Sequence, residues 1–281
     1  MIIETAHLTV LAENSVRRPN LLAEHGLAFW VDTGQQRLLF DTGQGAVLKP
    51  NAQALDVPLE STDAIVLSHG HYDHTGGLAH VLQVAPQARL YAHPAAFEPK
   101  FSYWEEKSRA IGIPATSEQA VRERAVEVVS TECPTEIFPG MFITGPIPRR
   151  TSYEDTGGPF FIDEAGRVAD PLMDDQAVFF NTRAGTVVLL GCAHAGVINT
   201  LEYIGELTNG RHIHAVMGGM HLVAATPERI NQTISALRRL DIEQLGPGHC
   251  TGMAANVEIW SALPGKCFLC AVGTQMEFGG A

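Results

Sequence analysis

Four side chains that can bind a metal ion lie within six residues of one another: His69, His71, Asp73 and His74. They directly follow residues 64–67, an apolar run typical of a buried strand. Alternate residues of an extended strand end project to one side, so His69, His71 and Asp73 are expected to converge. Imidazole and carboxylate groups are ligands for zinc, and they also suit iron or manganese. The spacing therefore predicts a metal site at the end of this strand.

Three other histidines occur in a similar setting. These are His194, His221 and His249. Each lies in a glycine-containing corner that follows a short apolar segment and precedes a predicted helix. Ligands of α/β proteins bind where strands end at one sheet edge, so these corners are expected to meet the His69 loop. The remaining histidines lie in predicted strands, helices or ordinary loops, and we do not expect them to bind metal: His7, His25, His80, His93, His212 and His214.

The segment His69-x-His71-x-Asp73-His74 resembles the metal motif of the metallo-β-lactamase superfamily. Segments that resemble one branch of it extend over most of the chain: AEHGLAFWV, LLFDTGQG, LSHGHYDHTGGL, TGPIPR, LLGCAHAGV, GGMHL and GPGHCTG. That branch contains metal-dependent hydrolases similar to the 7,8-dihydropterin-6-methyl-4-(β-D-ribofuranosyl)-aminobenzene-5′-phosphate synthase of methanopterin synthesis. The resemblance implies an α/β fold, the αββα sandwich of two mixed sheets flanked by helices, with a metal site at one edge of the sheets.

The sequence offers more metal-binding side chains than one tetrahedral ion can use, so we expect two divalent metal ions. Zinc is the expected metal, and iron and manganese are the alternatives. One ion is expected on His69, His71 and His194. The other is expected on Asp73 and His74, together with a further corner histidine.

That further ligand is expected to be His221 or His249. The usual lactamase and glyoxalase pattern has Asp or Cys after a strand-end glycine, and here Gly191-Cys192 is followed by His194 two residues on. Whether Cys192, His194 or His221 fills the bridging position is therefore left open.

Three residues are expected to be catalytic. Asp73 would bind an ion and orient the attacking water, with His74 beside it. Asp41 ends the predicted strand 37–40, where a turn aspartate capping its own backbone is the alternative. Because the superfamily has an aspartate in this place, we favour a hydrogen bond from the histidine loop to Asp41.

Substrate contacts are expected from residues 94–124 and from the loop after residues 141–144. The first segment is predicted to be a helix with its aromatic face on the core, or a lid whose Tyr103 and Trp104 stack on the substrate. In the second, Pro146 and Pro148 fix the loop, so Arg149 is either a clamp for a carboxylate or phosphate or a solvated surface residue.

Composition limits the classes of partner. The chain of 281 residues carries a net charge of −12 and no extended basic cluster, which opposes nucleic-acid binding. Its apolar runs are too short to cross a membrane, and the N-terminus lacks signal-peptide features, so we expect a cytoplasmic protein. Five scattered cysteines do not indicate a disulfide framework. One domain over residues 1–281 is expected, and the oligomeric state is left open.

The pattern of strands and turns supports this organisation. Hairpins are predicted over residues 28–40 and 177–190, helices over 79–84, 197–207 and 254–263, and a closing strand over 267–272. A helix is predicted from Thr226 as N-cap and Pro227 as first residue.

The function expected is that of a metal-dependent hydrolase or transferase acting on a small anionic substrate, phosphorylated and pterin-like. An iron-containing redox or sensing protein on the same fold is the alternative, and a phosphodiesterase or nuclease is a weaker one.

Overall fold

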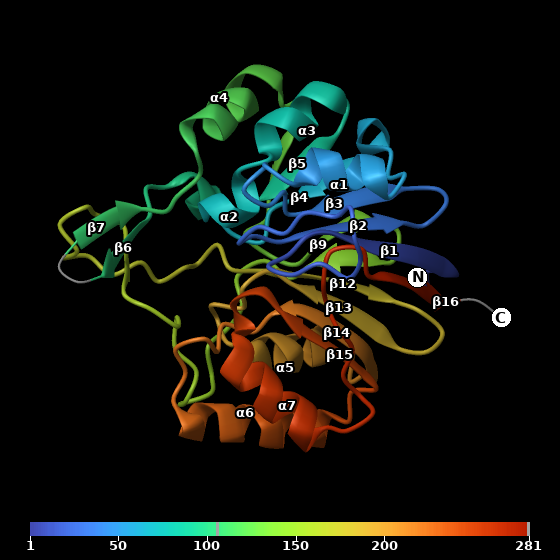
Figure 1. Ribbon diagram of the computed structural model, residues 1–281, viewed down its shortest axis with the longest axis vertical. Coiled ribbons are helices and arrows are strands. Elements are labelled where there is room, and N and C mark those ends of the chain that lie inside the picture. Colours follow the sequence, from blue (N-terminus) through green and yellow to red (C-terminus); the bar gives the residue numbers. More distant parts are fainter. Residues whose placement is uncertain (105–106, 280–281) are drawn as a thin grey trace.

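The computed structural model describes residues 1–104 and 107–279, the side chain of Trp104 excepted. Two mixed β-sheets pack face to face at its centre (Figure 1). The first has the order β16 (Gln275–Gly279), β1 (Thr5–Ala12), β2 (Ala28–Asp32), β3 (Arg37–Phe40), β4 (Ala64–Val66), β5 (Arg89–Ala92) and β8 (Val128–Ser130). The second has the order β15 (Gln244–Gly248), β14 (Ile213–Gly219), β13 (Thr186–Leu190), β12 (Ala177–Asn181), β10 (Met141–Ile143) and β9 (Thr135–Phe138).

Helices cover the outer face of each sheet (Figure 1). Helices α1 (Leu48–Ala54), α3 (Leu78–Val84) and α4 (Ala115–Arg124) lie on the first sheet, and α5 (Val197–Leu207), α6 (Pro227–Leu240) and α7 (Met253–Ala262) lie on the second. The α6 start is as predicted, because the Thr226 side chain accepts a hydrogen bond from the Arg229 amide and Pro227 is the first residue. This four-layer arrangement confirms the predicted αββα sandwich.

The parallel part of each sheet determines where the functional corners lie. Strands β3, β4, β5 and β8 run parallel, as do β13, β14 and β15. Parallel neighbours need crossover connections, which the helices supply here, and their carboxyl ends lie at one edge of the sheet. The predicted hairpins at residues 28–40 and 177–190 are confirmed by antiparallel pairing of β2 with β3 and of β12 with β13.

Apolar side chains form three layers between these elements. The central layer, between the two sheets, contains Phe29, Phe40 and Phe180. The others lie between each sheet and its helices, around Trp30 on one side and Ile234 on the other. The strands between two such layers are buried on both faces, which explains their continuous apolar sequence. Among the described residues, no helix has the length and apolar character needed to cross a membrane.

The prediction of a helix packing aromatic side chains from residues 94–124 is wrong for most of the segment. A 3₁₀ turn (Pro94–Phe97) is followed by the hairpin of β6 (Phe101–Trp104) and β7 (Lys107–Ala110), and α4 is the only α-helix among the described residues of this segment. β6 also pairs with β11 (Phe160–Phe161), so a distant segment completes a small sheet that projects from the sandwich (Figure 1). Strand pairing from outside the segment overrides its local preference.

The predicted closing strand over residues 267–272 is also wrong. Cys267 and Val272 form only isolated bridges, to Leu245 and Val16. Gly273 then adopts a φ of +86° that redirects the chain, and the closing strand is β16, paired with β1.

Candidate metal centre

The histidine loop leaves the end of β4 and enters the short helix α2 (Tyr72–Thr75). Its tight course depends on Gly70, where a Cβ atom would overlap the Ala96 carbonyl. The Gly70 amide donates a hydrogen bond of 2.7 Å to Asp174, which is buried and lies 3.0 Å from the Lys100 ammonium group. A buried ion pair from a distant part of the chain therefore fixes the loop.

His69, His71 and His194 form the first donor group. One ring nitrogen from each lies within 4.8 Å of the others, and His69 Nε2 is 2.9 Å from His71 Nδ1. His194 Nδ1 is 2.9 Å from the Thr156 carbonyl, which favours the tautomer with an unprotonated Nε2. Nε2 of His71 and Nε2 of His194 are buried and have no hydrogen-bond partner among the described residues. These are the three residues predicted to hold one ion.

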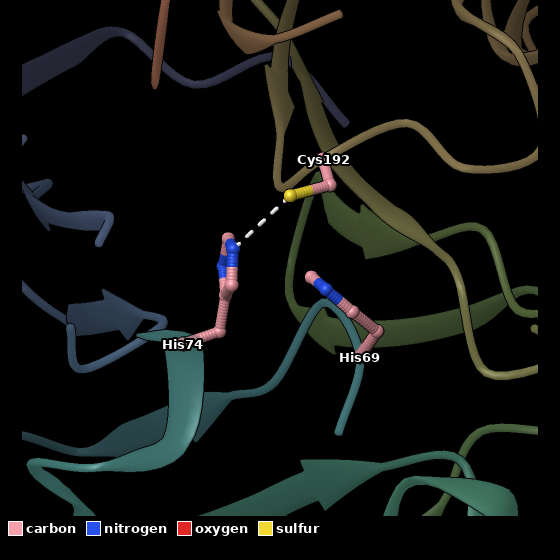
Figure 2. Close-up of side chains that lie close together, drawn as sticks. All are labelled: His69, His74 and Cys192. Atoms are coloured by element: carbon pink, nitrogen blue, oxygen red, sulfur yellow. Dashed lines mark hydrogen bonds between the residues drawn. The ribbon is translucent and has the colours of Figure 1, made fainter. Parts of the chain in front are cut away.

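His69, His74 and Cys192 form the second group, and Figure 2 shows the His74 ring directed at the Cys192 sulfur. Cys192 Sγ and His74 Nε2 are 3.2 Å apart. The other nitrogen of His74, Nδ1, lies 2.7 Å from the carboxylate of Asp41, which also accepts hydrogen bonds of 2.7 Å from the amide and hydroxyl of Ser68. The predicted hydrogen bond to Asp41 is therefore present, and it holds the His74 ring with Nε2 facing Cys192.

Asp73, His249 and His25 form the third group. Asp73 Oδ2 lies 3.4 Å from His249 Nε2 and 3.3 Å from His25 Nε2. His249 Nε2 is in turn 3.2 Å from His74 Nε2, which joins this group to the second. His25 was not expected at the site. It comes from the loop before β2, and no local feature of that loop indicated a ligand.

A fourth group consists of Cys192, His221 and Cys250. His221 and His194 stack with ring centroids 4.2 Å apart, so this group adjoins the first. Cys250, next to His249, was not predicted as a site residue, although its position in a strand-end corner is the same signal that identified the histidines. The four predicted corners thus meet at one sheet edge.

Burial keeps several of the histidines neutral. Burial lowers the pKa of His71 to about 3, although Asp73 opposes the shift. Burial and the adjacent imidazoles hold the pKa values of His69 and His194 well below the usual range. His74 differs, because Asp41 and Asp73 outweigh its burial and raise its pKa to about 9. Although burial opposes ionisation of Asp73, His74 and His249 hold the pKa of this carboxyl below its usual range.

This arrangement fits divalent metal ions. Neutral imidazoles with buried, unpartnered nitrogens are unfavourable unless a cation or proton lies between them. Nε2 of His74 lies 3.2 Å from Nε2 of His249 and 3.2 Å from Sγ of Cys192, where a metal ion can replace the proton that the raised pKa of His74 retains. Nitrogen, sulfur and carboxylate donors together are a ligand set typical of zinc.

A cavity of about 950 Å³ opens over these groups. Asp73, His194 and Cys192 line it, as do Phe160 and Ile111. Further apolar lining residues, together termed the apolar wall, come largely from α7 and neighbouring loops: Val223, Met253, Val257, Trp260 and Leu269. Among the described residues that line the cavity, Arg109 is the only arginine or lysine.

Arg149 and Tyr103, which were predicted to bind substrate, do not line the cavity. Arg149 is exposed, does not line the cavity, and donates a hydrogen bond of 2.6 Å to the Pro171 carbonyl. Tyr103 packs edge-on against Phe161, outside the cavity lining. Trp104 belongs to β6, and its side chain lies outside the described part of the chain. Arg109 was missed because its approach to the cavity depends on the β6–β7 hairpin.

Comparisons with known proteins agree with this fold. Residues 22–249 match the family model of the metallo-β-lactamase superfamily. A relative from Methanocaldococcus jannaschii, named 7,8-dihydropterin-6-methyl-4-(β-D-ribofuranosyl)-aminobenzene-5′-phosphate synthase, is 30% identical over 83% of each chain.

Solved structures also match this fold. A crystal structure described as a metal-dependent hydrolase of the β-lactamase superfamily superposes with a TM-score of 0.84 and 31% identity, covering 98% of this chain and 100% of the other. Zinc-bound PqqB from Methylobacterium extorquens, at 13% identity and a TM-score of 0.58 over 96% of this chain and 99% of the other, shares the fold. On these matches and on its four-layer architecture, the chain belongs to the metallo-β-lactamase superfamily.

Proposed function

We propose that this chain is a metal-dependent hydrolase or transferase that acts on a small anionic substrate at a two-metal site. The observation that carries the proposal is the convergence of four donor groups, each with at least one member lining a cavity of about 950 Å³. Cavities of this size enclose small molecules, and a few polar groups in them orient the ligand. The name of the M. jannaschii relative supports a phosphorylated substrate that carries a flat ring.

The chain supplies the ligands and their orientation. When bound, two divalent ions would lower the pKa of a water towards ~7 and polarise a carbonyl or phosphoryl oxygen. One ion would be held by the first donor group and the other by the joined second and third groups: His69, His71 and His194, then Asp73, His74 and His249. Asp73, which lines the cavity, would also accept a hydrogen bond from the attacking water and so orient it.

Arg109 and the apolar wall would bind the rest of the substrate. The Arg109 guanidinium lies 5.1 Å from the centre of the Tyr72 ring, a cation–π contact that holds it at the cavity. From there it can bind a phosphate or carboxylate in the forked geometry that arginine favours. Trp260 and Val257 on α7 are partly exposed and face the same cavity, where they would pack against the ring.

A substrate screen followed by a matched pair of variants tests the proposal. Zinc-loaded protein would be assayed against phosphate esters, phosphodiesters, lactams and thioesters. With an anionic substrate found in this way, Arg109→Ala should raise KM by about 10-fold or more, because a charge-assisted contact is lost. Arg149→Ala is the control and should leave KM unchanged, since Arg149 does not line the cavity. Equal effects of the two variants would reject Arg109 as the anion contact. A lack of metal-dependent turnover across all four substrate classes would count against the proposed function.

A further inference from the structure

Two cysteines and a histidine meet at the ends of three adjacent strands. Cys192, His221 and Cys250 follow β13, β14 and β15, which are neighbours in the second sheet. The two sulfur atoms and one nitrogen of His221 lie within 4.8 Å of one another, and all three residues line the cavity. Each strand thus contributes one donor that can bind a soft metal ion.

The backbone makes room for this group. A Cβ atom on Gly219 would lie 2.5 Å from Cys250 Sγ and 2.6 Å from the Gly191 carbonyl, so only glycine lets the sulfur reach its position. His221 has a φ of +43°, which is strained for a residue other than glycine. Its Nδ1 atom is buried and has no hydrogen-bond partner among the described residues. A strained backbone together with a buried ring nitrogen that has no partner indicates a ligand that the protein itself does not supply.

Cys270 shows what an ordinary core cysteine looks like in this chain. It is buried and lines the same cavity, yet it belongs to none of the donor groups found among the described residues. Burial at the cavity therefore does not account for the grouping of Cys192 and Cys250 around His221.

We propose that Cys192, His221 and Cys250 hold a thiophilic divalent ion, zinc by preference. Thiolate ligands select zinc over magnesium and manganese, and the bound thiols release their protons to solvent. Because Cys192 also faces His69 and His74 (Figure 2), its sulfur would be shared with the histidine site. This proposal depends on the proposed function in one respect, that His69 and His74 also bind metal. It assumes nothing about the substrate.

Cobalt substitution tests the site directly. Co²⁺ added to the reduced, metal-free full chain should produce the near-ultraviolet charge-transfer absorption of a cobalt–thiolate bond. In Cys250→Ser this absorption should fall to about half, because one of two thiolate ligands remains. In the control, Cys270→Ser, it should equal that of the unmodified protein. Absence of the band from the unmodified chain, or a Cys250→Ser variant with an undiminished band, would overturn the proposal.

A second measurement needs no variant and so does not depend on folding of a mutant. Zinc should protect Cys192 and Cys250 of the unmodified chain from alkylation, as mapped by mass spectrometry, whereas exposed Cys133 should react equally with and without zinc. Equal labelling of Cys192 and Cys250 in both conditions would refute the site. Neither readout requires turnover, so a positive result with an inactive protein would reject the proposed function and leave the site standing.

Discussion

Replacing Asp41 by asparagine would test how the fold prepares the histidines for metal. Asp41 is fully buried and accepts hydrogen bonds of 2.7 Å from His74 Nδ1 and from the Ser68 hydroxyl. Because this hydroxyl donates to Asp41, it can accept a hydrogen bond from His69 Nδ1, 2.8 Å away. One carboxylate thus selects the tautomer of two rings and leaves both Nε2 atoms free for a metal ion.

The expected size of the effect follows from these contacts. Asparagine keeps the shape of aspartate and tolerates the left-handed backbone at Asp41, where φ is +60°. One carboxylate oxygen becomes an NH₂ donor, so at least one of the three donors loses its acceptor, at a cost of about 1.5–3 kcal/mol in unfolding free energy. Loss of such an orienting partner weakens metal binding by about 10–100-fold, or about 1.4–2.7 kcal/mol.

Zinc competition against a chromogenic chelator would measure the affinity, and urea unfolding of the metal-free chain would measure the stability. Asp241→Asn is the matched control, because Asp241 also has a left-handed backbone, with φ +50°, but lies at the surface beside Lys266. It should leave the zinc affinity unchanged. A folded Asp41→Asn protein with zinc affinity within about twofold of the unmodified chain would refute the reasoning.

Two further substitutions test the loop and its support. Asp73→Asn should lower turnover by orders of magnitude, because it removes the negative charge that lies 3.4 Å from His249 Nε2. The circular dichroism spectrum should stay unchanged. Full turnover with full metal content would contradict this expectation. Lys100→Met should lower the unfolding free energy by about 3–5 kcal/mol, because it leaves the buried carboxylates of Asp170 and Asp174, each 3.0 Å from the Lys100 ammonium, without their cation. Thermal unfolding measures this loss, and a melting temperature equal to that of the unmodified chain would contradict it.

The parts of the site that could be predicted are those that local sequence specifies. An apolar strand, a glycine corner and a following helix are readable within about ten residues, and so are the donors that such a corner carries. Parallel strands then bring the corners together without further information. This is why His194, His221 and His249 could be connected with the His69 loop from the sequence.

Long-range contacts explain what was not predicted. Arg109 reaches the cavity through a hairpin that is completed by β11, some fifty residues later in the chain. The support of Gly70 by Asp174 joins residues 104 positions apart. No local pattern at Arg109 or Asp174 indicates these positions, and the rigid proline loop drew attention to Arg149, which does not line the cavity.

Backbone strain at two metal-donor residues and at Asp41, which orients His74, shows that the fold helps to set their positions. Asp41, His221 and His249 all have left-handed backbone conformations, with φ values of +60°, +43° and +49°. Each costs about 1–2 kcal/mol for a residue with a side chain, and this cost must be offset by the surroundings. At His249 the amide donates a hydrogen bond of 2.7 Å to the buried carboxylate of Glu13, and at Asp41 three donors hold the side chain. Since these contacts come from the protein and not from an ion, we expect Asp41 and His249 to be in place before metal binds.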